Sequence, residues 1–216
     1  MDRDAVERRR AGFTLVELLA VMAILSLLVG LTLTIVSKAR ASGNLNACKL
    51  QLRDIALNLQ LYVDERKGGK WPKERGIKFL LMMVKDGFLR GEDLKKFACP
   101  GTNDDTRRTE GEAAGSGISN WDELDPDCIS YAGRDNTGQF ALRKDRLSEE
   151  IIASDDNWQG GAGRANHGGI TNIVFADGHT DIVETSKYSS DLAEGQEWLP
   201  VGPDSPDENL KKLVVD

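Results

Sequence analysis

The residues best suited to chemistry lie in the C-terminal half of the chain. His167 precedes Asp177 and Gly178 with the spacing H-x9-D-G. An imidazole and a carboxylate are groups that serve general acid–base chemistry or bind a metal ion. The alternative is structural: Asp177 caps a turn, and His167 hydrogen-bonds to the backbone of a glycine-rich corner. The nine residues between His167 and Asp177 read as a strand, so the two side chains need not meet.

A second group of polar residues offers oxygen ligands. Asp155 and Asp156 follow a strand candidate and precede Asn157. Since Ca²⁺ takes about six to eight oxygen ligands, Asp155, Asp156 and Asp177 are candidate calcium ligands. The chain has no D-x-D-x-D loop closed by a glutamate, and Asx residues are common at turns without metal. Calcium is the one cofactor that the sequence suggests.

The three cysteines allow one disulfide. Cys99 and Cys128 bracket a polar, glycine-rich stretch, and pairing them would close about 28 residues, worth roughly 3–4 kcal/mol. The alternative is two buried free thiols. Cys48 lies among apolar neighbours and is expected in the core. A Cys–His nucleophile pair has no motif around it, and the only two histidines, His167 and His179, argue against a zinc hydrolase.

Composition excludes several classes of protein. The chain has 28 Lys+Arg against 35 Asp+Glu, a net charge of −7, which disfavours a general nucleic-acid binder. Its 40% hydrophobic and 29% charged residues exclude a disordered acidic chain and a polytopic membrane protein. No GxxxxGK[ST], GxGxxG or GxSxG motif occurs. We therefore expect no enzymatic activity.

The elements that position these residues begin with an apolar segment. Residues 13–36 contain one charged residue, Glu17, and no proline. As a helix they would span roughly 36 Å, enough to cross a hydrocarbon core of about 30 Å. Three arginines at 8–10 precede them, so the positive-inside rule places residues 1–12 in the cytoplasm and the acidic remainder outside. Glu17 is costly there unless it lies at the interface or meets a cation.

The remaining chain predicts a small mixed head. Residues 37–67 carry apolar side chains at three- and four-residue steps and continue the helix. A short buried helix is expected at 77–85. Strand candidates follow at residues 128–132, 140–142, 151–153, 172–176 and 179–184, the last two joined by the hairpin signal Asp177-Gly178.

The predicted fold class is α+β, with a long N-terminal helix packed on a small antiparallel sheet. The first half of the helix is transmembrane, and the head spans residues 68–188. Residues 189–216 are acidic and contain three prolines, so we expect an extended or disordered tail.

The stretch RRRAGFTLVELLAVMAIL closely resembles the type IV prepilin cleavage-and-methylation signal of type IV pilins and type II secretion pseudopilins. The resemblance implies that residues 1–12 are a leader, cut between Gly12 and Phe13 by a prepilin peptidase. It also implies N-methylation of Phe13 and pairing of Glu17 with the N-terminal amine of a neighbouring subunit. The H-x9-DG spacing resembles an element near the C-terminus of many prepilin-like proteins, and major pseudopilins often bind calcium in a C-terminal loop.

This resemblance implies a pilin-like structural subunit of a type II secretion-like or type IV pilus-like filament that supports protein secretion. Its partners would be copies of itself, other pseudopilins, the prepilin peptidase and the secretion or pilus assembly machinery. It would cross the bacterial inner membrane once, with the head periplasmic or extracytoplasmic. The alternative is a minor pilin that binds a ligand or DNA at a filament tip. No nucleic acid is expected unless Arg107-Arg108 or residues 143–146 form a basic patch.

Overall fold

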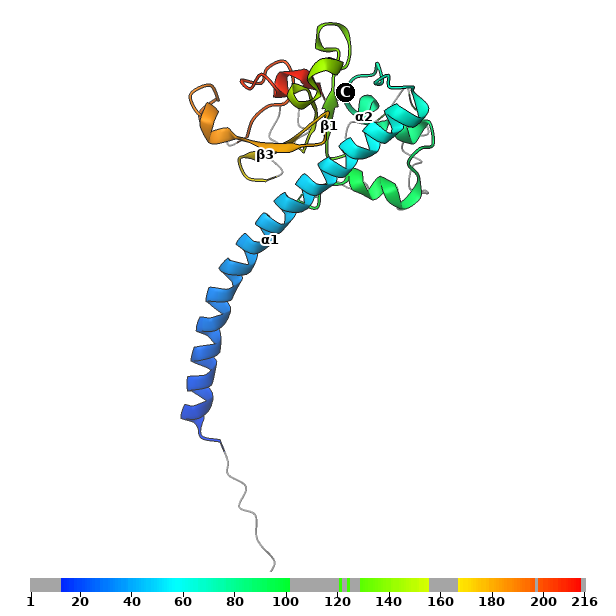
Figure 1. Ribbon diagram of the computed structural model, residues 1–216. Helices are drawn as coiled ribbons and strands as arrows, with labels where there is room; N and C mark the ends of the chain where they lie inside the picture. Colours follow the sequence, from blue (N-terminus) through cyan, green and yellow to red (C-terminus); the bar gives the residue numbers. More distant parts are fainter. Residues whose placement is uncertain are drawn as a thin grey trace, which may run out of the picture. The chain divides into compact units, whose positions relative to one another are not determined.

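One long helix runs through both compact units of the chain. The computed structural model describes residues 13–101, 121, 124, 129–155, 167–196 and 198–214. The units are Met1–Arg40 and Ala41–Asp216, and helix α1 (Leu15–Arg66) begins in the first and ends in the second (Figure 1). The predicted segments 13–36 and 37–67 therefore form one uninterrupted helix. Gly68 and Gly69 end it with φ of 57° and 74°, backbone angles that favour glycine.

The second unit contains a five-stranded antiparallel sheet with the strand order β4-β3-β2-β1-β5. Its strands are β1 (Ala132–Arg134), β2 (Ile151–Ser154), β3 (Ile170–Phe175), β4 (Thr180–Glu184) and β5 (Leu213–Val214). The other elements are α2 (Gly76–Lys85) and the 3₁₀ helices η1 (Gly91–Phe97), η6 (Gly138–Phe140), η7 (Lys144–Glu149), η8 (Thr185–Tyr188) and η9 (Leu210–Lys212). The fold class is α+β, as predicted.

Both faces of the sheet are covered. Because side chains alternate along a strand, Ile152 and Val174 join a core cluster with α1 and α2. Ile151 and Ile173 point to the opposite face and join a second cluster. That cluster is completed by residues of the C-terminal segment, namely Leu199, Val201, Leu210 and Leu213.

Three expectations need correction. The strand candidate at 128–132 begins only at Ala132, and Phe140 of the candidate at 140–142 lies in the 3₁₀ helix η6. The largest difference concerns residues 189–216, because strand β5 pairs with β1 and Leu210 is fully buried. The segment expected to be an extended or disordered tail is thus part of the fold over its described C-terminal part, because its apolar side chains cover one face of the sheet.

The first strand packs very closely on helix α2. A Cβ atom added to Gly133 would lie 2.0 Å from the carbonyl oxygen of Gly76. Only a residue without a side chain allows this approach. The backbones of β1 and α2 are therefore in direct contact at Gly133 and Gly76.

The C-terminal end of α1 is tied to the end of α2 by polar contacts. The Tyr62 hydroxyl donates to the Asp86 carboxylate at 2.6 Å, and the Lys67 ammonium lies 2.7 Å from the same carboxylate oxygen. The hydrogen bond from Lys67, and to a lesser extent that from Tyr62, lowers the pKa of Asp86, although partial burial acts to raise it.

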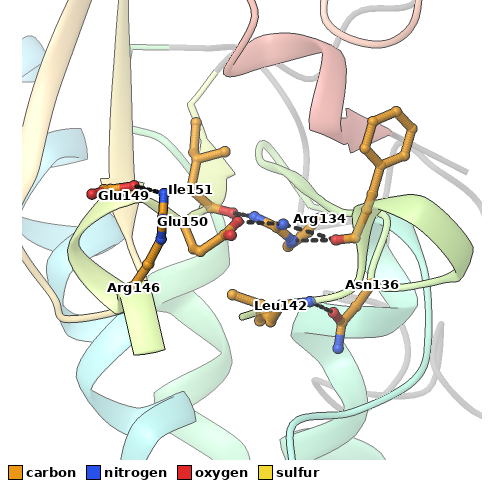
Figure 2. Close-up of polar contacts among 8 residues, drawn as sticks. Arg134, Asn136, Leu142, Arg146, Glu149, Glu150 and Ile151 are labelled. Atoms are coloured by element: carbon orange, nitrogen blue, oxygen red, sulfur yellow. Dashed lines mark hydrogen bonds and ion pairs between the residues drawn. The ribbon is translucent and has the colours of Figure 1, made fainter. Parts of the chain in front are cut away.

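A buried arginine connects β1 with the start of β2 (Figure 2). Arg134 is 2% exposed and donates to the Ile151 carbonyl at 2.6 Å, to the Glu150 carboxylate at 2.5 Å and to the Phe140 carbonyl at 2.8 and 2.9 Å. Burial lowers the pKa of Arg134, and the Glu150 carboxylate opposes this. The guanidinium therefore holds three segments of the head together, because each of its three nitrogens donates at least one hydrogen bond.

Candidate functional site

The first turn of α1 is closed by a reciprocal pair of side-chain hydrogen bonds. The Thr14 backbone N–H and hydroxyl donate to Oε2 of Glu17 at 2.9 and 2.8 Å, and the Glu17 N–H donates to the Thr14 hydroxyl at 3.3 Å. This is a capping box, in which Thr and Glu satisfy each other's otherwise unpaired backbone donors. The sequence carries the signal for this cap, T-x-x-E ahead of an apolar run, at residues 14–17.

The apolar side chains that follow the cap are exposed. From Phe13 to Val36, the large hydrophobic side chains are 44–82% exposed. By length and composition, α1 is long and apolar enough to cross a membrane, and no other helix in the described ranges meets this test. An apolar surface of this extent is normally covered by lipid or by other proteins. Gly12 of the predicted cleavage site lies outside the described residues.

Asp177 and Gly178 form the turn of the β3–β4 hairpin. The Asp177 carboxylate accepts the His179 backbone N–H at 3.1 Å and lies 2.5 Å from Nδ1 of its imidazole. Gly178 has φ of 88°, which a side chain would strain. Burial acts to raise the pKa of Asp177, but the hydrogen bonds from His179 outweigh it and the pKa lies below its usual value. Asp177 therefore makes the contacts expected if it caps the hairpin turn, which was the structural alternative to a catalytic or metal-binding role.

His167 lies at the other end of β3 in a buried environment. Its side chain is 3% exposed, and Nε2 lies 3.3 Å from Oδ2 of Asp155 and 3.2 Å from Sγ of Cys99. Burial lowers the pKa of His167, which favours the neutral imidazole at pH 7. The structure thus brings His167 to Asp155 and Cys99, side-chain partners that the spacing H-x9-D-G does not indicate. It does not bring His167 to Asp177.

The disulfide joins Cys48 to Cys99, with the two Cα atoms 5.3 Å apart. Both alternatives for Cys99, a disulfide with Cys128 and a free thiol, are therefore wrong, since Cys99 is bonded to Cys48. Cys128 lies outside the described residues. The apolar stripe of α1 correctly placed Cys48 in the core, where it is fully buried. No local pattern indicates that Cys48 faces Cys99, because this contact depends on how the second half of α1 packs within the head.

The two described candidate calcium ligands, Asp155 and Asp177, lie apart. The Asp155 carboxylate is fully buried and accepts the Asn172 backbone N–H at 2.8 Å and its side-chain amide at 2.5 Å. Asp177 caps the hairpin beyond the opposite end of β3. Asp156 lies outside the described residues. Calcium binding by these residues stays a prediction.

The candidate basic patch at residues 143–146 contains acidic partners. Arg143 lies 3.5 Å from Asp145. Arg146 lies 3.3 Å from Glu149, a pair drawn in Figure 2. These side chains are more than half exposed. Neighbouring opposite charges weaken the attraction of such a segment for the phosphates of a nucleic acid. The other candidates, Arg107 and Arg108, lie outside the described residues.

Comparison with known families decides the character of the N-terminal segment. A model of the prokaryotic N-terminal methylation motif matches residues 8–33. The chain carries the prepilin-type signal. No curated protein and no solved structure matches the chain.

The prepilin-type signal supports a type IV pilin-like or pseudopilin subunit in general, a structural rather than an enzymatic class. It implies peptidase processing and assembly into pilus or pseudopilus filaments. Together with the apolar helix α1, it indicates membrane anchoring. The matched residues end well before His167, so the role of the H-x9-DG element stays a prediction.

Proposed function

We propose that this chain is a pseudopilin-like subunit of a type II secretion-like or type IV pilus-like filament that supports protein secretion. A prepilin peptidase would cut between Gly12 and Phe13, and Phe13 would then be N-methylated. The mature chain would cross the bacterial inner membrane once, with the head on the extracytoplasmic side. The observation that carries this proposal is the prepilin-type signal at residues 8–33 on an exposed apolar helix.

Glu17 has two roles in this proposal. In the single chain, its Oε2 accepts both donors of Thr14. A carboxylate has about four lone-pair sites, so the capping box leaves capacity for one more cation. We expect that cation to be the amine of Phe13 from a neighbouring subunit, which would offset the cost of the carboxylate within the membrane.

The experiment separates these two roles. Glu17→Gln removes the charge, but glutamine is still able to complete a capping box. Thr14→Val removes the hydroxyl of the box and keeps the charge. Membranes and sheared filaments are collected from the native host, and the chain is analysed by intact mass and N-terminal sequencing.

We expect the wild-type chain to begin at methylated Phe13 and to enter the filament fraction. Gly12→Val should remain uncut. Glu17→Gln should be cut but absent from filaments, and Thr14→Val should be cut and assembled. Wild-type chain that retains residues 1–12 would refute the processing proposal. Normal assembly of Glu17→Gln would refute the charge-pairing role, because the cap alone would then suffice.

A further inference from the structure

Three side chains of metal-ligand type converge in the head, and a fourth adjoins one of them. Cys48 lies on α1, Cys99 follows η1, Asp155 follows β2 and His167 precedes β3. The ligand atoms of Cys48, Cys99 and His167 all lie within 4.8 Å of one another. Oδ2 of Asp155 lies 3.3 Å from Nε2 of His167. Each of these side chains is nine-tenths or more buried.

Two of the distances in this cluster match those between ligands of one small, tetrahedrally coordinated ion. Zinc lies about 2.3 Å from thiolate sulfur and about 2.0–2.2 Å from imidazole nitrogen or carboxylate oxygen. Tetrahedral angles then separate neighbouring sulfur and nitrogen ligands by about 3.6 Å, and nitrogen and oxygen ligands by about 3.3 Å. The corresponding observed distances are 3.2 Å from Cys99 Sγ to His167 Nε2 and 3.3 Å from that nitrogen to Asp155 Oδ2. The two sulfurs are the exception, since they are bonded to each other.

We propose that the reduced form of the chain binds one Zn²⁺ ion through Cys48, Cys99, His167 and Asp155, and that this site and the Cys48–Cys99 disulfide are alternative states of the head. A shared sulfur–sulfur bond leaves neither cysteine as a thiolate, which is the form that binds zinc. The disulfide and the metal site therefore exclude each other.

The surroundings support a built site. Asp155 is oriented by two donors from Asn172, at 2.8 and 2.5 Å. The Asn172 side-chain amide also lies 3.3 Å from the Leu45 carbonyl of α1, so the carboxylate is fixed relative to the helix that carries Cys48. Hydrogen bonds of this kind orient ligands in metal sites. Burying an imidazole and a carboxylate costs free energy, and a bound cation would offset that cost.

Zinc binding to the reduced chain needs no oxidant or reductant. Zn²⁺ displaces one proton from each thiol of Cys48 and Cys99, so that two protons leave as one ion binds. Oxidation requires a disulfide compound as electron acceptor. The thiolate of one cysteine attacks this disulfide, forms a mixed disulfide with one half of it and releases the other half as a thiolate. The thiolate of the second cysteine then attacks the first cysteine's sulfur and releases the remaining half as a second thiolate. The acceptor takes two electrons, the Cys48–Cys99 bond forms, and Zn²⁺ is released.

The test uses the full-length chain in detergent, reduced, freed of metal and then titrated with Co²⁺ as a spectroscopic substitute for zinc. We expect one equivalent to bind with the visible bands of a tetrahedral site and a thiolate-to-metal charge-transfer band, both removed by Zn²⁺. His167→Ala should weaken binding by more than the 10- to 100-fold typical of losing an outer partner. His179→Ala, which changes the exposed hairpin histidine, is the matched control and should bind normally.

The wild-type chain itself provides the second arm. Before reduction it should not bind Co²⁺, and oxidised glutathione added to the zinc form should release one equivalent of Zn²⁺ to a colorimetric chelator. This arm needs no substitution, so a folding defect of His167→Ala does not weaken it. Absence of the tetrahedral spectrum in the reduced wild-type chain would overturn the proposal. Equal binding by a folded His167→Ala chain, or by the disulfide form, would overturn it as well.

Discussion

The Cys48–Cys99 disulfide should contribute substantially to the stability of the head. The bond joins residues 51 positions apart in the sequence. In the chain-entropy description, closing a loop of this length restricts the unfolded chain by about 4 kcal/mol at 25 °C. For a domain of this size, each kcal/mol shifts the melting temperature by about 2–4 °C. Reduction should therefore lower the melting temperature by about 8–16 °C.

The assay compares one protein in two redox states. The chain in detergent is heated with and without a phosphine reductant, and unfolding is followed by near-UV circular dichroism of its tryptophans. Both samples contain EDTA, because zinc bound to the reduced head would stabilise it and mask the effect. The Cys128→Ala variant should show the same difference, since it leaves Cys48 and Cys99 in place.

Two outcomes would refute the reasoning. Equal melting temperatures in the two redox states would mean that the bond does not constrain the unfolded chain as the loop length requires. Loss of the difference in Cys128→Ala would mean that Cys128, rather than Cys48, is the partner that matters.

Two further predictions concern polar contacts of the head, both measured by unfolding in urea. Arg134→Met leaves the Glu150 carboxylate buried without its cation and should lower the free energy of unfolding of the head by about 3–5 kcal/mol. The double variant Arg134→Met, Glu150→Leu should lower it by less, because no unpaired charge stays buried. Equal losses in the two variants would contradict this. Because hydrogen bonds from Lys67 and Tyr62 lower the pKa of Asp86 from 3.8, their contribution is present above that pH and is lost as pH falls through the lower folded-state pKa. Asp86→Asn should therefore show a weaker loss of stability between pH 5 and pH 3 than wild type, and identical pH dependence would count against the assignment.

The local features of the fold were predictable from the sequence. The three- and four-residue spacing of apolar residues along α1 identified buried positions such as Leu52, Ile55 and Leu59. The Asp177-Gly178 pair predicted the β3–β4 hairpin. Its loop has three residues, Ala176, Asp177 and Gly178, and only Gly178 takes a positive φ, which glycine allows. The prepilin-type signal is also local, since its residues are contiguous in the chain.

The features that the sequence did not reveal depend on contacts between distant segments. Three cysteines allow three pairings, and the choice of Cys48 follows from where α1 crosses the head. The position of His167 depends on the backbone at Gly168 and Gly169, which have φ of 58° and 86°. The C-terminal segment is acidic and proline-rich, yet Leu199 and Leu210 are fully buried. Its order comes from the second face of the sheet, which no local pattern in that segment describes.

The disulfide also has a mechanical consequence for a chain anchored by one end of its long helix. A force applied between the N-terminal end of α1 and the sheet reaches Cys48 and passes directly to Cys99 through a covalent bond. The covalent path of the force thus bypasses the intervening residues, which include the C-terminal turns of α1 and all of α2. If the head unfolds under load, the oxidised chain would extend about 170 Å less than the reduced chain, because the 51-residue separation is closed. The redox state of one cysteine pair thus determines how far the subunit extends when a pulling force unfolds its head.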